Sequence, residues 1–142
     1  MNLLQENTEL SKKIEAFGRE RLKILKENLK SKILAENGVN IIADQVDVDN
    51  ASMLKDLAFQ LKNEVDNLYL VLGADIEGKP NLTIMISENL VNERGLNAGQ
   101  IVREAGREIK GGGGGQPFYA TAGGKDISGL QAAIEKALGF IN

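Results

Sequence analysis

Seven of the chain's 16 glycines lie in the stretch GGGGGQPFYATAGGKD, residues 111–126, and five of them form one run from Gly111 to Gly115. Glycine loses more backbone entropy on folding than any other residue. Five in a row within a domain therefore indicate a backbone that needs positive φ or that another molecule approaches closely. A flexible linker is not indicated, because a periodic helical segment precedes the run, and a proline, two aromatics and a second helical segment follow it.

The two common phosphate-binding motifs do not fit this stretch. A Walker loop needs Gly and Ser or Thr at fixed offsets from a Gly-Lys pair, and Tyr119 and Asp126 occupy those places. The dinucleotide fingerprint needs a third glycine where Gln116, Pro117 or Phe118 stands. Nucleotide binding through either motif is therefore not expected.

The stretch does resemble the signature of the DHHA1 domain at the C-terminus of alanyl-tRNA synthetase. That signature is a glycine run, a proline two residues on, and then Ala-x-Ala-Gly-Gly-Lys-Asp. Its positions are filled here by Gly111–Gly115, Pro117, Ala120, Ala122, Gly123, Gly124, Lys125 and Asp126. The segments 94–105 and 47–49 also resemble the family, so the resemblance covers about residues 37–142. Residues 1–36 resemble only the variable helix that joins this domain to the editing domain.

The chain contains neither histidine nor cysteine. It therefore lacks the commonest general base near neutral pH and the nitrogen and sulfur ligands of zinc. In the family resembled, the editing domain carries paired His motifs with a Cys, which this chain cannot contain. The related DHH phosphoesterases usually carry His directly after the glycines, where this sequence has Gln116, and this argues against phosphoester hydrolysis. No catalytic residue and no cofactor are expected in this chain.

Three carboxylates alternate near the end of an expected strand, at Asp44, Asp47 and Asp49. Such a pattern can hold Mg²⁺, but alternating acids at a strand end are more often solvated or cap the next helix, and no phosphate-binding motif accompanies them. We therefore expect no metal site.

The net charge of −3 is unevenly distributed. Residues 1–33 carry eight Lys and Arg against five Glu, and residues 34–142 carry nine against fifteen acids. An acidic domain is a poor general binder of nucleic acid, so any RNA contact must be local or must read shape. The chain has no apolar run long enough to span a membrane and no signal-peptide pattern at its start, so we expect a cytoplasmic location.

The first segment reads as one long amphipathic helix from Leu3 to Leu34, closed by Asn37 or Gly38 in a left-handed conformation. Its apolar stripe is longer than a small domain can cover, which predicts an oligomerisation helix over residues 1–36 followed by a globular domain over 37–142. The alternative is a helix folded back on its own domain. The stripe that would form the oligomerisation surface comprises Leu10, Ile14, Phe17, Leu22, Leu25 and Leu29.

The rest of the chain alternates strand and helix patterns. Strands are expected at 39–46, 68–72 and 82–87, with a hairpin over 75–80. Helices are expected after Asp49 or Asn50, over 97–110 and over 128–138, the last beginning at Asp126 or Ser128. This order predicts an α/β fold: a small mixed β-sheet with helices packed on it, preceded by the long N-terminal amphipathic helix.

Glycine backbone flanked by cations predicts an RNA-binding surface, because bare backbone can approach a base pair and cations can face phosphates. The candidate residues are Gly111, Gly112, Gly113, Gly114, Gly115, Gln116, Gly123, Gly124, Lys125, Arg103, Arg107 and Lys110. The alternatives are glycines that serve only packing, and cations that are solvated or paired with neighbouring acids. Of the adjacent Phe118 and Tyr119, one is expected in the core and the other exposed, where its ring can stack on a base.

The resemblance implies a non-catalytic role. In the family this part binds the outer corner of the tRNA L, helps to bring the aminoacylation and editing domains onto one tRNA, and takes part in self-association. The parent enzyme would be an alanine-tRNA ligase that uses ATP and Mg²⁺, with Zn²⁺ in its editing domain. The alternatives are an accessory substrate-binding domain of a DHH-type phosphoesterase or of a free-standing editing protein, and a pure oligomerisation module.

Overall fold

The computed structural model describes residues 20–36, 38–48 and 50–140, which form one six-stranded sheet of order β1-β2-β3-β4-β6-β5. β2 and β3 pair in parallel, and every other neighbouring pair of strands is antiparallel. The expected mixed α/β sheet is therefore confirmed. The strands are β1 Leu34–Glu36, β2 Val39–Gln45, β3 Leu68–Ile76, β4 Lys79–Ile86, β5 Gly112–Gly115 and β6 Tyr119–Gly123.

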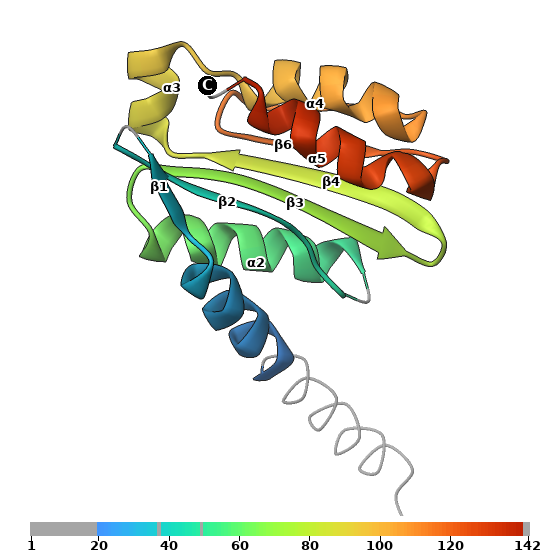
Figure 1. The fold of residues 1–142 in the computed structure, drawn as a ribbon, viewed down its shortest axis with the longest axis horizontal. Helices are drawn as coiled ribbons and strands as arrows, with labels where there is room; N and C mark the ends of the chain where they lie inside the picture. Colours follow the sequence, from blue (N-terminus) through green and yellow to red (C-terminus); the bar gives the residue numbers. More distant parts are fainter. Residues whose placement is uncertain (1–19, 37, 49, 141–142) are drawn as a thin grey trace, which may run out of the picture.

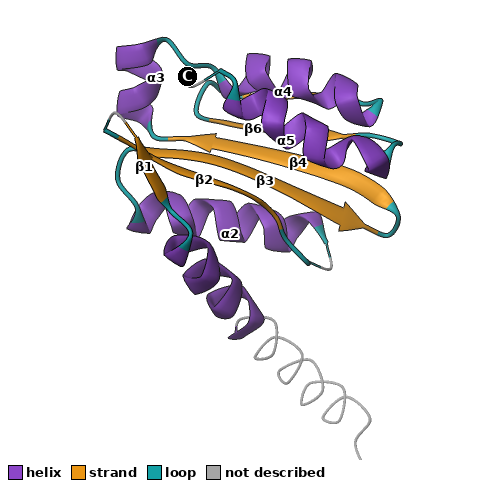
Figure 2. Ribbon diagram, viewed as in Figure 1, coloured by secondary structure: helices purple, strands orange, loops and turns teal. Residues whose placement is uncertain are grey.

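Helices cover both faces of the sheet (Figures 1 and 2). α2 (Ala51–Glu64) and an N-terminal helix over residues 20–31 lie on one face, and α4 (Ala98–Gly106) and α5 (Leu130–Leu138) lie on the other. α3 (Glu88–Arg94) follows β4 at one end of the sheet. The strand residues alternate between the two faces, so each face buries its own apolar cluster.

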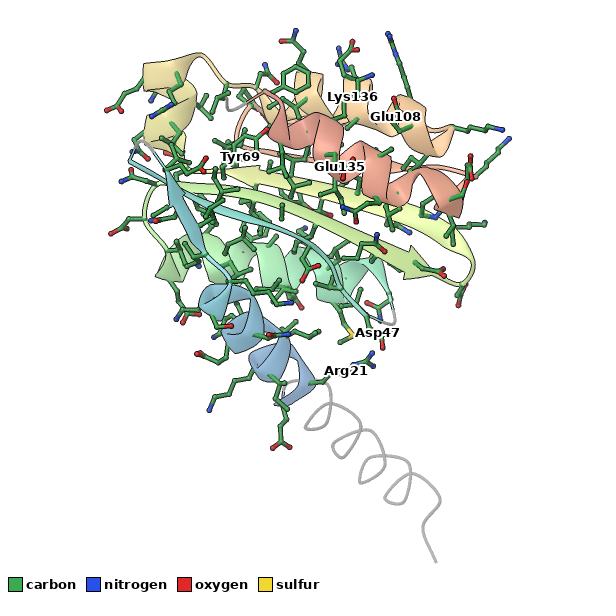
Figure 3. All side chains as sticks on the ribbon, viewed as in Figure 1. Arg21, Asp47, Tyr69, Glu108, Glu135 and Lys136 are labelled. Carbon is green, nitrogen blue, oxygen red and sulfur yellow. The ribbon has the colours of Figure 1, made fainter. Side chains whose placement is uncertain are left out.

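A buried tyrosine fastens α5 to the sheet. Tyr69 of β3 is fully buried, and its hydroxyl donates a hydrogen bond to the carbonyl of Ala137 in α5 (Figure 3). Burial raises the pKa of Tyr69 well above its usual value. The hydroxyl therefore remains protonated at neutral pH and acts as a hydrogen-bond donor.

The expected cap at Asn50 and the expected hairpin are confirmed. The Asn50 side chain accepts a hydrogen bond from the Met53 N–H and caps α2, and Asn97 caps α4 in the same way through the Gln100 N–H. β3 and β4 are joined through Glu77 (φ 54°) and Gly78 (φ 81°). Two consecutive left-handed residues define the type I′ turn, which matches the twist of a two-residue hairpin.

The N-terminal segment differs from the expected single helix to Leu34. The described helix ends at residue 31, and Leu34–Glu36 instead forms β1, paired with β2. Gly38 is left-handed, with φ 81°, but it lies in the turn between these two strands and does not close a helix. Pairing with β2 satisfies the backbone of these residues, and this outweighs the helical periodicity of their side chains. Residues 1–19 lie outside the described part of the chain.

Two expected helices differ in form, and three further elements were not expected. The α-helical part of 97–110 stops at Gly106, and Arg107–Ile109 tighten into a 3₁₀ turn. This turn lets the Ile109 carbonyl accept hydrogen bonds from the N–H groups of Lys125 and Asp126. A second 3₁₀ turn, Ile127–Gly129, begins the last helix, so α5 itself starts at Leu130. α3, β5 and β6 were not expected at all.

Candidate functional site

The glycine run is an edge strand. Gly112–Gly115 form β5, which pairs only with β6 among the described strands, and the register places Gly112 opposite Gly123 and Gly114 opposite Thr121. The sequence predicted a backbone that needs positive φ or that another molecule approaches closely, and no strand was expected here. Backbone pairing with β6 determines the conformation instead.

Every second residue of the run must be glycine because the backbone of the β6 segment lies too close for a side chain. A Cβ on Gly111 would lie 2.0 Å from the Gly123 carbonyl oxygen, and one on Gly113 would lie 2.0 Å from the Thr121 carbonyl oxygen. A Cβ on Gly115, where φ is 159°, would lie 2.5 Å from the Tyr119 oxygen. No side chain fits between two strand backbones at these distances. These three glycines are therefore structural, as the packing alternative proposed.

The other glycines differ in whether a side chain would fit: a position is called open where an added Cβ meets no atom within 4 Å, and closed where it would collide with backbone. A Cβ on Gly112 or Gly123 would meet nothing within 4 Å, and both residues are exposed. Gly124 is closed, because a Cβ there would lie 2.2 Å from the Ile109 carbonyl oxygen. Gly112 and Gly123 are cross-strand partners, so together they form one patch of bare, accessible backbone at the edge of the sheet.

α4 supports the glycine strand from the side through small residues. A Cβ on Gly99 would lie 3.2 Å from the Gly115 carbonyl oxygen, and one on Gly106 would lie 3.4 Å from the Cβ of Ala122. These two glycines are two helical turns apart, so they let the helix approach β5 and β6 closely along its length. Arg103 lies between them in the sequence. Its Nε and Nη2 are 4.0 Å from the place of a Cβ on Gly114.

The expected cations surround the glycine strand but do not share one helix face. Arg103 belongs to α4, Arg107 begins the 3₁₀ turn, and Lys110 follows that turn with φ 54°. Arg107 is 3.5 Å from the Glu104 carboxylate, as the paired alternative proposed for such a residue. Lys125 is exposed at the end of β6, where its backbone N–H is bonded to Ile109.

Asp126 is the acidic group at this end of the sheet. Its carboxylate accepts hydrogen bonds from the hydroxyl and the backbone N–H of Ser128, and the first of these is the main reason that its pKa is lowered. The positive charge of Lys110 lowers this pKa further. Asp126 therefore stays ionised at neutral pH, and it offsets part of the local positive charge.

Gln116, Phe118 and Tyr119 form the turn between β5 and β6. The backbones of Gln116 and Tyr119 bond to each other across the turn, and the Gln116 side chain is exposed. The expectation that the two aromatics face opposite ways is wrong, because Phe118 lies in the turn and not in an extended strand. Both rings pack toward α2: Lys62 Nζ lies 4.4 Å from the Phe118 ring centroid, and the Tyr119 ring lies 5.0 Å from that of Phe59.

The part of the expected oligomerisation stripe that the structure describes packs within the chain. Leu22 is 8% exposed and Leu29 is 2% exposed, and Leu25 is half-buried against the same cluster under α2. This matches the alternative of a helix folded back on its own domain. Ile24 of the same helix is 64% exposed. The remaining stripe residues Leu10, Ile14 and Phe17 lie outside the described residues.

Of the three alternating carboxylates, Asp44 and Asp47 are paired with cations, and Asp49 lies outside the described residues. Asp44 is 2.9 Å from Lys32, and Asp47 is 3.2 Å from Arg21 (Figure 3). Both pairs tie the N-terminal helix region to the segment around β2. Within the described ranges, no three His, Cys, Asp or Glu side chains gather as metal ligands would.

One feature near the glycine strand was not foreseen in the sequence. A groove of about 350 Å³ lies between the first turn of α2 and strands β4 and β6, with Lys55, Thr83 and Thr121 in its lining. These residues are far apart in sequence and carry no motif. Only the sheet order, which inserts β4 between β3 and β6, brings them together.

The family model of the DHHA1 domain matches residues 38–142. The chain belongs to the DHHA1 domain family. The matched segment includes the whole sheet except β1, together with α2 to α5 and the glycine strand.

The chain is also similar to parts of longer curated proteins. It is 51% identical over 140 residues to the alanine--tRNA ligase of Christiangramia forsetii and 43% identical over 140 residues to that of Cytophaga hutchinsonii. Each alignment covers 99% of this chain but only 16% of the relative. The DHHA1 chain therefore spans about a sixth of the length of these relatives.

A solved structure shares the fold. The crystal structure of the C-Ala domain from Aquifex aeolicus alanyl-tRNA synthetase superimposes with a TM-score of 0.67 at 22% sequence identity, covering 76% of this chain and 96% of that one. None of the helices in the described part of the DHHA1 chain combines the length and the apolar character needed to cross a bilayer.

Proposed function

We propose that this DHHA1 chain is the tRNA-binding part of an alanine-tRNA ligase. The observation that carries the proposal is the identity of 51% and 43% with two alanine--tRNA ligases across nearly the whole chain, including the N-terminal segment that the DHHA1 match does not cover. The binding partner is tRNA, and the expected location is the cytoplasm, where tRNA is charged.

The proposed contact is between the glycine edge of the sheet and the outer corner of the tRNA L. Gly112 and Gly123 support this, because they offer exposed backbone with no side chain in the way. Arg103 lies near Gly114, Lys110 precedes the glycine run and Lys125 follows Gly124, and cations at these positions can face phosphates. Residues 34–142 are acidic in sum, so the contact reads shape more than charge, and affinity should fall only modestly with salt.

The proposed role is non-catalytic. By holding the tRNA corner, the domain helps to bring the aminoacylation and editing domains of the whole enzyme onto one tRNA. ATP and Mg²⁺, and Zn²⁺ in the editing domain, belong to those other parts, which fits a chain without His or Cys. Release of alanine from mischarged tRNA by the purified chain would contradict this role.

The test is a titration of the chain with tRNA and with an unrelated RNA duplex of equal length. We expect tighter binding of tRNA and similar affinity for tRNAs of different identity. Lys125→Glu should weaken tRNA binding by about 1 to 3 kcal/mol, the scale of a lost charge-assisted contact with added repulsion. The matched control is Lys23→Glu on the exposed face of the N-terminal helix, which makes the same charge change away from the glycine strand.

A second pair of variants tests the bare backbone. Gly123→Val adds a side chain where the structure has open space, so it should weaken tRNA binding without lowering the melting temperature. Gly124→Val is not a useful test of binding, because its Cβ would collide with the Ile109 carbonyl and disturb the fold. If Lys125→Glu and Gly123→Val both bind tRNA like the parent, the glycines serve only packing.

We also propose that the chain self-associates through the first part of its amphipathic segment. The exposure of Ile24 supports an apolar surface on this helix beyond what its own domain covers. Deleting residues 1–19 should leave a folded monomer, whereas deleting residues 1–34 would also remove Leu22 and Leu29 from the core. A full chain that sediments as a monomer at high concentration would contradict this proposal.

A further inference from the structure

The groove beside the glycine strand has the size and composition of a small binding site. Its volume of about 350 Å³ falls within the range of ligand pockets, which is roughly 300 to 1,000 Å³. The polar residues that line it come from three elements: Ser52 and Lys55 of α2, Asn81 and Thr83 of β4, and Tyr119 and Thr121 of β6. Ala51 and Leu54 of α2 supply the apolar part of the lining, whereas the Leu82 side chain is fully buried in the cluster on the other face of the sheet.

The Thr83 hydroxyl has no hydrogen-bond partner among the described residues. The residue is only 2% exposed. Buried hydroxyls are normally bonded, because leaving one unpaired costs free energy. No buried polar side-chain atom of the described residues is both enclosed and unpartnered, so the Thr83 hydroxyl must open into the groove.

Other hydroxyls of the lining are available in the same way. Those of Ser52, Tyr119 and Thr121 also make no hydrogen bond within the described residues. Burial raises the pKa of Tyr119, so its hydroxyl stays protonated at neutral pH and can donate. The groove therefore presents several hydroxyls whose partners must come from water or from a bound molecule.

The groove leads directly to the open glycines. Across the sheet, Asn81 is opposite Gly123, which is opposite Gly112, and in the next row Thr83 is opposite Thr121, which is opposite Gly114. Residues that pair directly across strands share one face. The rows that begin in the groove therefore end at Gly112, where a Cβ would meet nothing within 4 Å, and at Gly114, where the Arg103 guanidinium lies 4.0 Å from the place of a Cβ.

The charge of the lining favours a phosphate-bearing ligand. Lys55 is the one charged side chain among the described residues that line the groove. A larger hollow of about 610 Å³ near α3 has the opposite character: Asp66 and Glu88 line it, and its Lys62 is 3.7 Å from Glu88. Carboxylates repel phosphate, so the smaller groove is the better anion site.

We propose that this groove binds a single nucleotide unstacked from the RNA that lies on the glycine edge, with the base among the hydroxyls and the phosphate near Lys55. The inference rests on the proposed function, because the glycine edge must hold RNA to present a nucleotide there. A flat base has donors and acceptors for the hydroxyls and apolar faces that suit the non-polar part of the lining. A free mononucleotide has the same chemistry, and the test distinguishes the two sources.

Thr83→Val is the central variant, because it replaces the hydroxyl by a methyl group of similar size. We expect tRNA affinity to fall roughly three- to tenfold while the melting temperature stays the same or rises, since the hydroxyl has no protein partner. Ser87→Ala is the matched control: its hydroxyl accepts a hydrogen bond from the Leu68 N–H, so its loss should lower the melting temperature and leave tRNA affinity unchanged.

The charge is tested in the same assay. Lys55→Gln should weaken tRNA binding several-fold, and Lys23→Gln on the N-terminal helix should not. In parallel, AMP, GMP, CMP and UMP are titrated separately into the 142-residue chain and followed by NMR. If the source is RNA, mononucleotides shift the resonances of Thr83 and Thr121 only at high concentration, and Thr83→Val abolishes the shift of Thr121.

The outcomes separate this inference from the function on which it rests. If tRNA binds and Lys125→Glu weakens it, but Thr83→Val and Lys55→Gln bind like the parent, the groove proposal is overturned and the tRNA function stands. If tRNA does not bind but a mononucleotide binds tightly in the groove, the function and the RNA source are overturned. If neither tRNA nor any mononucleotide binds, both proposals fail.

Discussion

The two edges of the sheet are stabilised in different ways: the β5 edge by close backbone contact and the β1 edge by side-chain contacts. At the β5 edge, alternate glycines lie so close to β6 that a Cβ on Gly113 would be 2.0 Å from a carbonyl oxygen. At the β1 edge, the adjoining N-terminal helix is held by side chains: Leu29 is 2% exposed under α2, and Lys26 is 2.7 Å from Glu64. Adding a side chain should therefore lower stability at closed positions of the β5 edge, whereas removing a side chain should lower it at the β1 edge.

The largest effect is expected from Gly113→Ala. A single methyl group would collide with the Thr121 carbonyl and the Ala122 Cα, and neither is the end of a flexible side chain. We expect a loss of about 4 kcal/mol or more in the free energy of unfolding, or a detached β5. Urea denaturation measures the loss.

The matched control is Gly112→Ala, one residue earlier in the same strand. Its Cβ meets nothing within 4 Å and its φ is not left-handed, so stability should be unchanged or higher by about 0.4 to 1 kcal/mol. If both variants changed the free energy of unfolding equally, the alternation of open and closed glycines along β5 would not affect stability.

The next effect is expected at the other edge, from Leu29→Ala. The side chain is almost fully buried with Leu22 in the cluster under α2, so its truncation should cost about 2 to 3 kcal/mol. Thermal melting of this variant beside Ile24→Ala, which is exposed on the same helix, isolates the buried contribution. A stable Leu29→Ala variant would mean that the helix does not belong to the folded unit.

A smaller effect is expected from Gly99→Ala, which tests how α4 supports β5. A Cβ on the buried Gly99 would lie 3.2 Å from the Gly115 carbonyl oxygen, a contact that a small shift of the helix can relieve. We expect a cost of about 1 to 2 kcal/mol. Hydrogen exchange should show faster opening of β5, with protection in β2 and β3 unchanged. Uniform loss of protection throughout the sheet would contradict this local effect.

The smallest effect is expected from Glu64→Gln at the β1 edge. Its pKa is lowered mainly by the hydrogen bond from Lys26, with a further contribution from Lys30. A lowered pKa in the folded state means that the ion pairs stabilise the protein above the ordinary pKa of Glu, and that this contribution is lost as pH falls through the lowered value. Because the carboxylate is exposed to solvent, the effect should be slight and should disappear in high salt.

The family, the fold class and several boundaries were determined by the sequence alone. The motif that ends in Gly123-Gly124-Lys125-Asp126 indicated the family, and local signals such as Asn50, Asn97 and the Glu77-Gly78 turn predicted elements that the structure confirms. These signals act within a few residues of the chain. A cap or a turn needs no distant partner, so sequence reasoning can find it.

Only the tertiary structure decided which glycines are closely packed against another backbone and which are open to solvent. In the sequence Gly112 and Gly113 are equivalent, but pairing with β6 leaves one open and closes the other. The same holds for the groove, because the position of β4 beside β6 brings Thr83 next to Thr121. It also holds for Leu34–Glu36, where pairing with β2 prevails over a helical pattern. Strand register and close backbone contact depend on residues far apart in the chain, and no local pattern encodes them.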